Sequence, residues 1–111
     1  MTRRRLRVPT ANRGEVWLAD LGFVAKTRPC LVLSVPLDPQ DRVLLTLVPH
    51  TTSLQGTRFE VAVPKRFLQP GAFDVQGLVT VVPARLIRRL GALQPAEMAL
   101  IEEAVKRWLG L

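Results

Sequence analysis

The segment from Pro95 to Leu109 carries the one long helical pattern of this sequence, and it constrains what the rest of the chain can form. Met98, Ile101, Val105 and Trp108 recur at spacings of three and four residues, which places them on one face of a helix. A proline opens the segment and a glycine follows it, so both ends are marked. Upstream, the apolar segments are short and interrupted by prolines and glycines, which is typical of strands. The predicted fold class is mostly β with a C-terminal helix, an α+β protein.

Several short segments, either apolar throughout or alternating, are predicted to be strands. They cover residues 15–19, 29–34, 43–48, 58–63, 78–82 and 87–92. Pro49 is expected to end the third strand, and residues 84–86 are expected to form a short helical turn. Residues 49–57 and 64–76 are rich in polar and turn residues and are expected to be irregular. These elements predict a small, mostly antiparallel barrel that the helix covers.

The chain has 111 residues, one cysteine and one histidine. This length corresponds to a single domain, which we expect to span residues 13–111. Residues 1–12 are expected to form a flexible basic arm that either touches nucleic acid or remains a solvated tail. We expect no disulfide within the chain, no metal site built from Cys or His clusters, and no cofactor. Cys30 lies in an apolar run and is expected to be buried and inert.

The net charge of +7 and the pI of about 11.3 indicate a polyanionic partner. Nucleic acid is the leading candidate, and an acidic protein segment would respond to the same field. No apolar run approaches the roughly 20 residues of a membrane-spanning helix, and no signal-type apolar segment follows the basic N-terminus. A single cysteine fits the reducing cytoplasm, so we expect a cytoplasmic protein without a membrane partner.

The stretch from Lys26 to Ser34 joins a basic pair and a proline to a buried strand. Pro29 favours an extended conformation at Arg28 and suits the first residue of a strand. An arginine fixed at that point can offer its planar fork to a phosphate at little ordering cost. The alternative is an arginine at the strand edge that pairs with a surface carboxylate.

One chemistry that such residues permit is the cleavage of RNA without a metal ion. RNA supplies its own nucleophile, the 2′-hydroxyl, so the protein must align the attack, stabilise the charge on the phosphorane and move protons. Arg28 suits the stabilisation of charge. Thr51 or Thr52, in the hydroxyl-rich segment after Pro49, can donate a hydrogen bond or position a proton.

A set of motifs recurs in a particular order along the chain, at residues 13–17, 26–34, 48–53, 56–61, 78–81, 85–86 and 91–93 and in the closing helix. Together these motifs resemble the MazF/PemK (Kid) toxins of type II toxin–antitoxin systems. The resemblance implies an SH3-like antiparallel barrel of the CcdB/PemK type, a homodimer, and sequence-selective, metal-independent cleavage of single-stranded RNA such as mRNA. It implies products with a cyclic phosphate and a 5′-hydroxyl, and a cognate antitoxin with an acidic, flexible segment.

The resemblance also assigns roles to individual residues. Arg28 corresponds to the arginine that holds the phosphate and stabilises the transition state, and Thr51 to the catalytic hydroxyl, with Thr52 able to assist. His50 is either an acid–base group or a residue that faces the core. Trp17 either stacks on a base, or is half-buried or at the dimer seam. The candidate RNA-binding residues are Lys26, Thr27, His50, Ser53, Arg58 and Gln76.

Two non-enzymatic alternatives use the same small-barrel fold. One is a CcdB-like inhibitor of DNA gyrase that acts through a C-terminal helix containing a tryptophan, here Trp108. The other is a nucleic-acid-binding barrel that has lost activity. Arg28-Pro29 and Thr51 match the ribonuclease branch and favour the enzyme.

Overall fold

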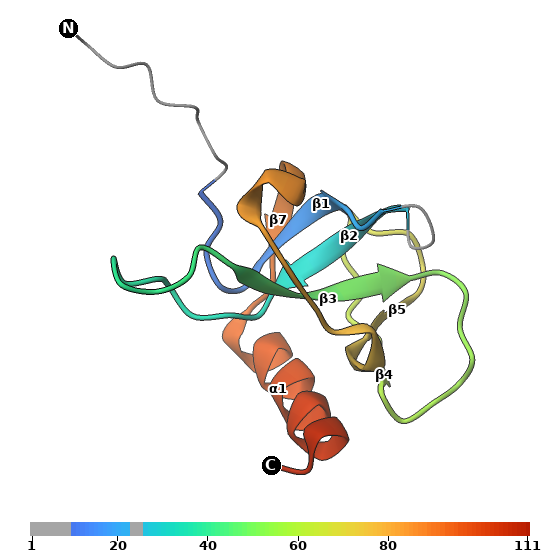
Figure 1. Ribbon diagram of the computed structural model, residues 1–111. Coiled ribbons are helices and arrows are strands. Elements are labelled where there is room, and N and C mark those ends of the chain that lie inside the picture. Colours follow the sequence, from blue (N-terminus) through green and yellow to red (C-terminus); the bar gives the residue numbers. More distant parts are fainter. Residues whose placement is uncertain (1–9, 23–25) are drawn as a thin grey trace, which may run out of the picture.

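The structure, a computed structural model, describes residues 10–22 and 26–111 (Figure 1). Most of the predicted basic arm lies outside the described residues, so its contact with nucleic acid stays a prediction. In the described part, short strands precede a single long helix. The strands are β1 (Glu15–Asp20), β2 (Thr27–Val32), β3 (Leu45–Thr51), β4 (Glu60–Val61), β5 (Ala72–Asp74), β6 (Val79–Val81) and β7 (Leu86–Ala92), the 3-10 helices are η1 (Val75–Gly77) and η2 (Pro83–Arg85), and the α-helix is α1 (Pro95–Leu109).

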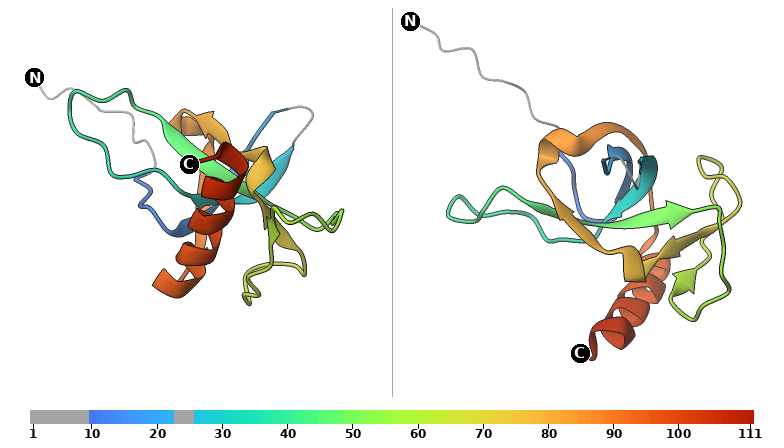
Figure 2. Two further views of the ribbon diagram at one scale, coloured as in Figure 1. Left: turned by 90° about the horizontal axis from the view of Figure 1, so that it is seen from below. Right: turned by 45° about the vertical axis from the view of Figure 1, so that its right-hand side comes forward.

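The strands form one antiparallel, seven-stranded sheet. Its order is β4-β5-β3-β2-β1-β7, and β6 also pairs with β3. The strands β6, β3, β2, β1 and β7 curve around, and η2 leads the chain from β6 into β7 (Figure 2). β6 and β7 are not paired with each other, so the sheet is not closed. The predicted fold class is confirmed, and the expected barrel takes the form of an open, curved sheet.

Consecutive residues of β2 are buried on opposite faces of this sheet. Leu31 belongs to a cluster that includes Met98 and Ile101 of α1, whereas Cys30 and Val32 belong to a second cluster formed with β1, β3 and β7. Successive side chains of a strand point to opposite faces, so a strand that is apolar throughout needs cover on both sides. Here α1 covers one face and the curved sheet encloses the other. Burial raises the pKa of the Cys30 thiol to about 12, which fits the inert role predicted for it.

The prediction that Pro49 ends the third strand is wrong, because β3 continues through it to Thr51. β3 pairs with β6 through Leu47 and with β5 from His50 onward. Pro49 lies between these two pairings, so its missing amide hydrogen removes no bond to either strand. The proline therefore marks the point where β3 changes its partner.

The prediction that residues 64–76 are irregular is wrong at one point, because β5 forms within them. β5 lies between β3 and β4 in the sheet, and β4 is shorter than predicted. Gly71 permits this close approach, because a Cβ there would collide with the backbone carbonyl oxygen of Thr51. The turn residues that precede β5 concealed the strand in the sequence.

The helix predicted at Pro95–Leu109 is confirmed with those bounds. At its start, the Glu97 carboxylate accepts a hydrogen bond from the backbone N–H of Gln94 (2.7 Å) and forms an ion pair with Nζ of Lys65 (2.6 Å). At its end, Gly110 takes the left-handed conformation with a φ of 71°. Local signals in the sequence were sufficient to predict the bounds of this helix, because Gln94 and Glu97 cap its start and Gly110 ends it.

We predict that Ile101→Ala will lower the free energy of unfolding by about 2–5 kcal/mol, because the fully buried side chain would leave a cavity between α1 and the sheet. Urea unfolding followed by circular dichroism measures this loss. Leu100→Ala is the matched control, because the Leu100 side chain lies one position away and is 53% exposed. Equal losses in the two variants would contradict the packing described here.

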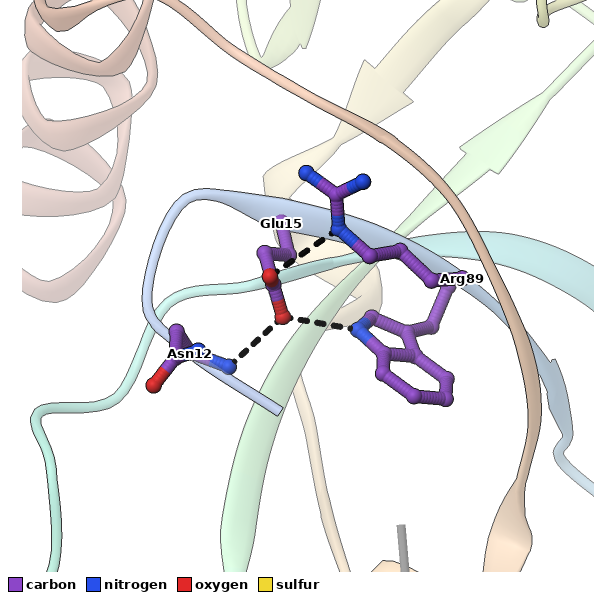
Figure 3. Close-up of polar contacts among 4 residues, drawn as sticks. Asn12, Glu15 and Arg89 are labelled. Atoms are coloured by element: carbon purple, nitrogen blue, oxygen red, sulfur yellow. Dashed lines mark hydrogen bonds and ion pairs between the residues drawn. The ribbon is translucent and has the colours of Figure 1, made fainter. Parts of the chain in front are cut away.

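Glu15 joins the first strand to the last through a hydrogen-bond network (Figure 3). One carboxylate oxygen accepts from the backbone N–H of Asn12 (2.8 Å) and the indole N–H of Trp17 (3.1 Å). The other oxygen accepts from Nε of Arg89 on β7 (2.9 Å). Burial alone would raise the pKa of Glu15, but these bonds bring it below its ordinary value of 4.5. Trp17 is half-buried and takes part in this network, as one of the two interpretations predicted.

We predict that Glu15→Gln will lower the free energy of unfolding by about 1–3 kcal/mol at neutral pH, since it weakens charge-assisted hydrogen bonds. The pKa of Glu15 is lowered by folding, so its stabilising effect is complete above pH 4.5 and is lost as the pH falls through the folded-state pKa. Unfolding measured between pH 7 and pH 3 should show the two proteins converging at low pH. Glu103→Gln, at a side chain that is 71% exposed, is the control. A difference independent of pH would contradict the prediction.

Candidate active site

A cavity with a volume of about 740 Å³ lies where β3 changes its pairing from β6 to β5. β2 forms one side of it, and the long loop between β3 and β4 forms another. Most of its polar groups come from hydroxyl, amide and carboxylate side chains. The lining residues are Leu21, Arg28, Pro49, Thr51, Ser53, Gln55, Thr57, Glu60, Asp74, Gln76, Gly77, Leu78 and Val79.

Arg28 is half-buried near the start of β2, directly before Pro29. It lies opposite Ala19 of β1, so its backbone is fixed by the ladder between β1 and β2. The following residues, Cys30 and Leu31, are fully buried and anchor the strand. The sequence predicted Arg28 at the junction between a loop and a strand that begins at Pro29. In the structure the strand begins at Thr27, so Arg28 belongs to the strand and lies at the edge of the cavity.

Thr51 is the last residue of β3 and lines the same cavity as Arg28. Its Oγ1 accepts a hydrogen bond from the backbone N–H of Ser53 (3.0 Å). Because this bond occupies an acceptor site on the oxygen, the hydroxyl hydrogen stays available to donate. The backbone of Thr51 is held as well, since it pairs with Ala72 in β5.

A second cavity of about 290 Å³ adjoins the first through Arg28, which lines both. Its other lining residues are Lys26, Thr27, Pro29, His50, Thr52 and Gln69. The two cavities together contain all of the predicted site residues except Arg58. Arg58 is exposed and lies over the ring of Phe59, with its guanidinium carbon 4.7 Å from the ring centroid.

His50 is buried, with 4% of its surface exposed, and its ring packs edge-on against Phe73 at a centroid distance of 5.1 Å. Burial lowers the pKa of His50 below its ordinary value of 6.5, so the neutral form is favoured at pH 7. This geometry favours the interpretation of His50 as a residue that faces the core.

Two carboxylates in the larger cavity, Glu60 and Asp74, were not among the predicted site residues. They lie opposite each other in the ladder between β4 and β5. Oδ1 of Asp74 accepts the backbone N–H of Gln76 (3.1 Å), which caps η1 and holds Gln76 at the cavity. Glu60 accepts hydrogen bonds from the loop that precedes it. The glutamate three residues after Thr57 was a sequence signal for such a local bond.

The described residues, 10–22 and 26–111, hold no group of three or more His, Cys, Asp or Glu side chains that could bind a metal ion. Among those residues, no helix is both long and apolar enough to cross a membrane. The polar groups at the site are a guanidinium, hydroxyls, amides and carboxylates.

The structure combines a curved antiparallel sheet and one C-terminal helix with a cavity that both a strand-held arginine and a threonine line. This combination defines a small basic protein suited to an anionic ligand. Residues 12–109 match the family described as the PemK-like, MazF-like toxin of type II toxin–antitoxin systems. The chain therefore belongs to this family.

Solved structures show the same fold. An endoribonuclease in complex with its cognate antitoxin, from a mycobacterial species, is 26% identical, with a TM-score of 0.79 over 92% of this chain and 97% of that chain. A further mycobacterial endoribonuclease is 25% identical, with a TM-score of 0.76 over 94% of this chain and 95% of that chain. MazF from Deinococcus radiodurans is 23% identical and shares the fold, with a TM-score of 0.75 over 95% of this chain and 99% of that chain.

Proposed function

We propose that this protein is a toxin that cleaves single-stranded RNA sequence-selectively and without a metal ion. The observation that carries the proposal is the shared cavity of Arg28 and Thr51, one a fixed cation and the other a hydroxyl oriented by the Ser53 N–H. Membership of the MazF-like family and the similarity to mycobacterial endoribonucleases support the same activity.

In the proposed reaction the 2′-oxygen of the RNA attacks the adjacent phosphorus. A bond forms between O2′ and phosphorus, and the bond between phosphorus and O5′ breaks, which leaves a 2′,3′-cyclic phosphate and a 5′-hydroxyl. Arg28 stabilises the extra negative charge on the phosphorane, where a preorganised donor is most effective. Thr51 donates a hydrogen bond or positions the proton that moves from O2′ or onto O5′.

The remaining site residues are proposed to hold the RNA on both sides of the scissile phosphate. Ser53 and Gln76 line the larger cavity and offer neutral hydrogen-bonding groups. Lys26, Thr27 and Thr52 line the smaller cavity, with His50 beneath them, and offer a cation and hydroxyls to the backbone. Arg58 lies outside both cavities, and its proposed contact is with RNA that extends beyond them.

The proposed protein partners follow from charge and from family membership. We propose a cognate antitoxin with an acidic segment, because a net charge of +7 attracts a flexible polyanion as it attracts RNA. The mycobacterial endoribonuclease in complex with its cognate antitoxin supports this partner. We also propose a homodimer and a cytoplasmic location, with residues 13–111 acting as the single toxin domain.

We predict that Arg28→Ala will reduce RNA cleavage about 100- to 1000-fold, because a charge-stabilising donor is lost from the transition state. The measurement uses a long, mostly unstructured RNA with excess chelator, and maps fragments that end in a cyclic phosphate. Arg88→Ala is the matched control, because it removes the same charge from an exposed position on β7 that neither cavity includes.

Strong residual cleavage by Arg28→Ala would reject the role of Arg28. If the wild-type protein binds the RNA but leaves it intact, the result would instead indicate the nucleic-acid-binding barrel that has lost activity. If the protein neither binds nor cleaves RNA, inhibition of DNA gyrase becomes the next test.

We predict that Thr51→Val will reduce cleavage about 100- to 10,000-fold while RNA binding changes little, because valine keeps the shape of threonine but has no proton to donate. Thr51→Ser keeps the hydroxyl, so it should restore most of the activity. Single-turnover cleavage and filter binding separate the two effects. Equal activity in the valine and serine variants would rule out a role for the hydroxyl.

A further inference from the structure

The loop between β3 and β4 has few contacts of its own with the core. Residues 52–58 are all exposed, and residues 52–57 belong to no strand. Gly56 takes a left-handed conformation, with a φ of 75°, that most residues adopt only under strain. A loop of this kind needs a specific interaction to hold one conformation.

The carboxylate of Glu60 supplies that interaction. Its Oε1 accepts hydrogen bonds from three consecutive backbone N–H groups, those of Gln55 (3.2 Å), Gly56 (2.7 Å) and Thr57 (3.0 Å). Its Oε2 also accepts from the Gln55 N–H, at 2.9 Å. The Gln55 bond is the largest cause, and with the other two it brings the pKa of Glu60 below its ordinary value of 4.5.

Glu60 itself is anchored by the sheet. It pairs with Asp74 in β5, and the next residue, Val61, pairs with Phe73, which is fully buried. The carboxylate therefore projects from a fixed strand, while the amides that it binds belong to the exposed loop. The loop is held at a defined distance from β4 as a result.

The same loop forms one wall of the larger cavity. Ser53, Gln55 and Thr57 line the cavity together with Arg28. Thr57 is fixed twice more, because its Oγ1 accepts the Phe59 N–H (3.3 Å) and its carbonyl accepts the Glu60 N–H (3.3 Å). The bonds to Glu60 therefore set how the side chains of Gln55 and Thr57 face whatever occupies the cavity.

A carboxylate at this place has an electrostatic cost for the proposed function. Glu60 lines a cavity that is proposed to bind a polyanion, and like charges repel there. If the charge acted alone, its removal would strengthen RNA binding. The bonds to three amides give the carboxylate a second effect, because they fix the shape of the cavity wall. This second effect favours RNA binding, whereas the charge alone opposes it.

We propose that Glu60 is a positioning residue that fixes the loop 53–57 as the wall of the RNA cleft and so determines which RNA sequences are cleaved. Gln55 and Thr57 are the side chains that it holds toward the bases. This inference rests on the proposed ribonuclease function, but its structural part can be tested without RNA.

The first experiment measures cleavage of two RNAs, the preferred sequence and one with a single altered base, by wild type, Glu60→Gln and Glu60→Ala. For Glu60→Ala we expect a higher KM for the preferred RNA and a preference between the two RNAs reduced about 10- to 100-fold, because a small misplacement of a positioned group has effects of this size. Glu60→Gln should be intermediate, since its amide oxygen accepts the same N–H groups more weakly. A lower KM in both variants, with the preference unchanged, would overturn the proposal and leave only charge repulsion.

Glu103→Ala is the matched control, because it removes one negative charge from an exposed position on α1. We expect it to leave both KM and the preference between the two RNAs unchanged. A change equal to that of Glu60→Ala would assign the effect to net charge and overturn the proposal.

The second experiment follows the backbone amides of Gln55, Gly56 and Thr57 by NMR without RNA. In wild type we expect their proton shifts to titrate together with a midpoint below 4.5, and in Glu60→Gln we expect that titration to disappear. Glu60 has three other charged side chains near it: Arg28 and Asp74 line the same cavity, and Arg58 is close in the sequence. All three are unchanged in Glu60→Gln, so a titration that they caused would persist in the variant.

The two experiments distinguish two kinds of failure. If the three amides respond in the same way in wild type and Glu60→Gln, Glu60 does not hold the loop, and the inference fails while the ribonuclease function stands. If the amides respond as expected but the wild-type protein neither binds nor cleaves RNA, the proposed function fails and the RNA role of Glu60 fails with it.

Discussion

Burial of both faces of β2 and β3 is the constraint on which the rest of this structure depends. Leu31 and Val48 contribute to the cluster beneath α1, while Cys30 and Leu47 contribute to the cluster on the opposite face. A flat sheet with a single helix would leave one of these clusters in water. The sheet curves instead, and α1 covers its outer face. Arg28 then stands near the start of a strand whose last three residues, Cys30 to Val32, are fully buried and anchor it.

The cavity follows from the way β3 divides its pairing. One edge of β3 bonds first to β6 and then to β5, and Pro49 lies in the interval between them. The two partner strands must diverge at this interval, so a hollow lined by η1 and the loop after Thr51 remains beside the proline. The proline at which β3 changes its partner therefore also lines the proposed site.

Sequence alone predicted the elements whose determinants are local. The helix from Pro95 to Leu109 has its periodicity and its caps within a few residues. Arg28 directly precedes Pro29, and Thr51 follows Pro49 by two residues, so a proline marks each of them. β5 was missed because its signal is not local: Gly71 is required only because the chain passes close to Thr51. Glu60 was missed for a different reason: the amides that it binds lie only three to five residues before it, but an alternating strand pattern does not show that its carboxylate will accept them.

Charge acts in this protein at two ranges. The net charge of the whole chain is positive, whereas two of the side chains that line the larger cavity are negative. The net charge of +7 attracts any polyanion that comes within about a Debye length, roughly 8–10 Å, without regard to its sequence. Inside the larger cavity, Glu60 and Asp74 contribute negative charge, and each accepts backbone N–H groups of a segment that lines the cavity. In the proposed function, the long-range attraction offsets the cost of these two carboxylates to RNA affinity. Their contribution is a wall of fixed shape, and discrimination between similar RNAs depends on shape more than on net charge.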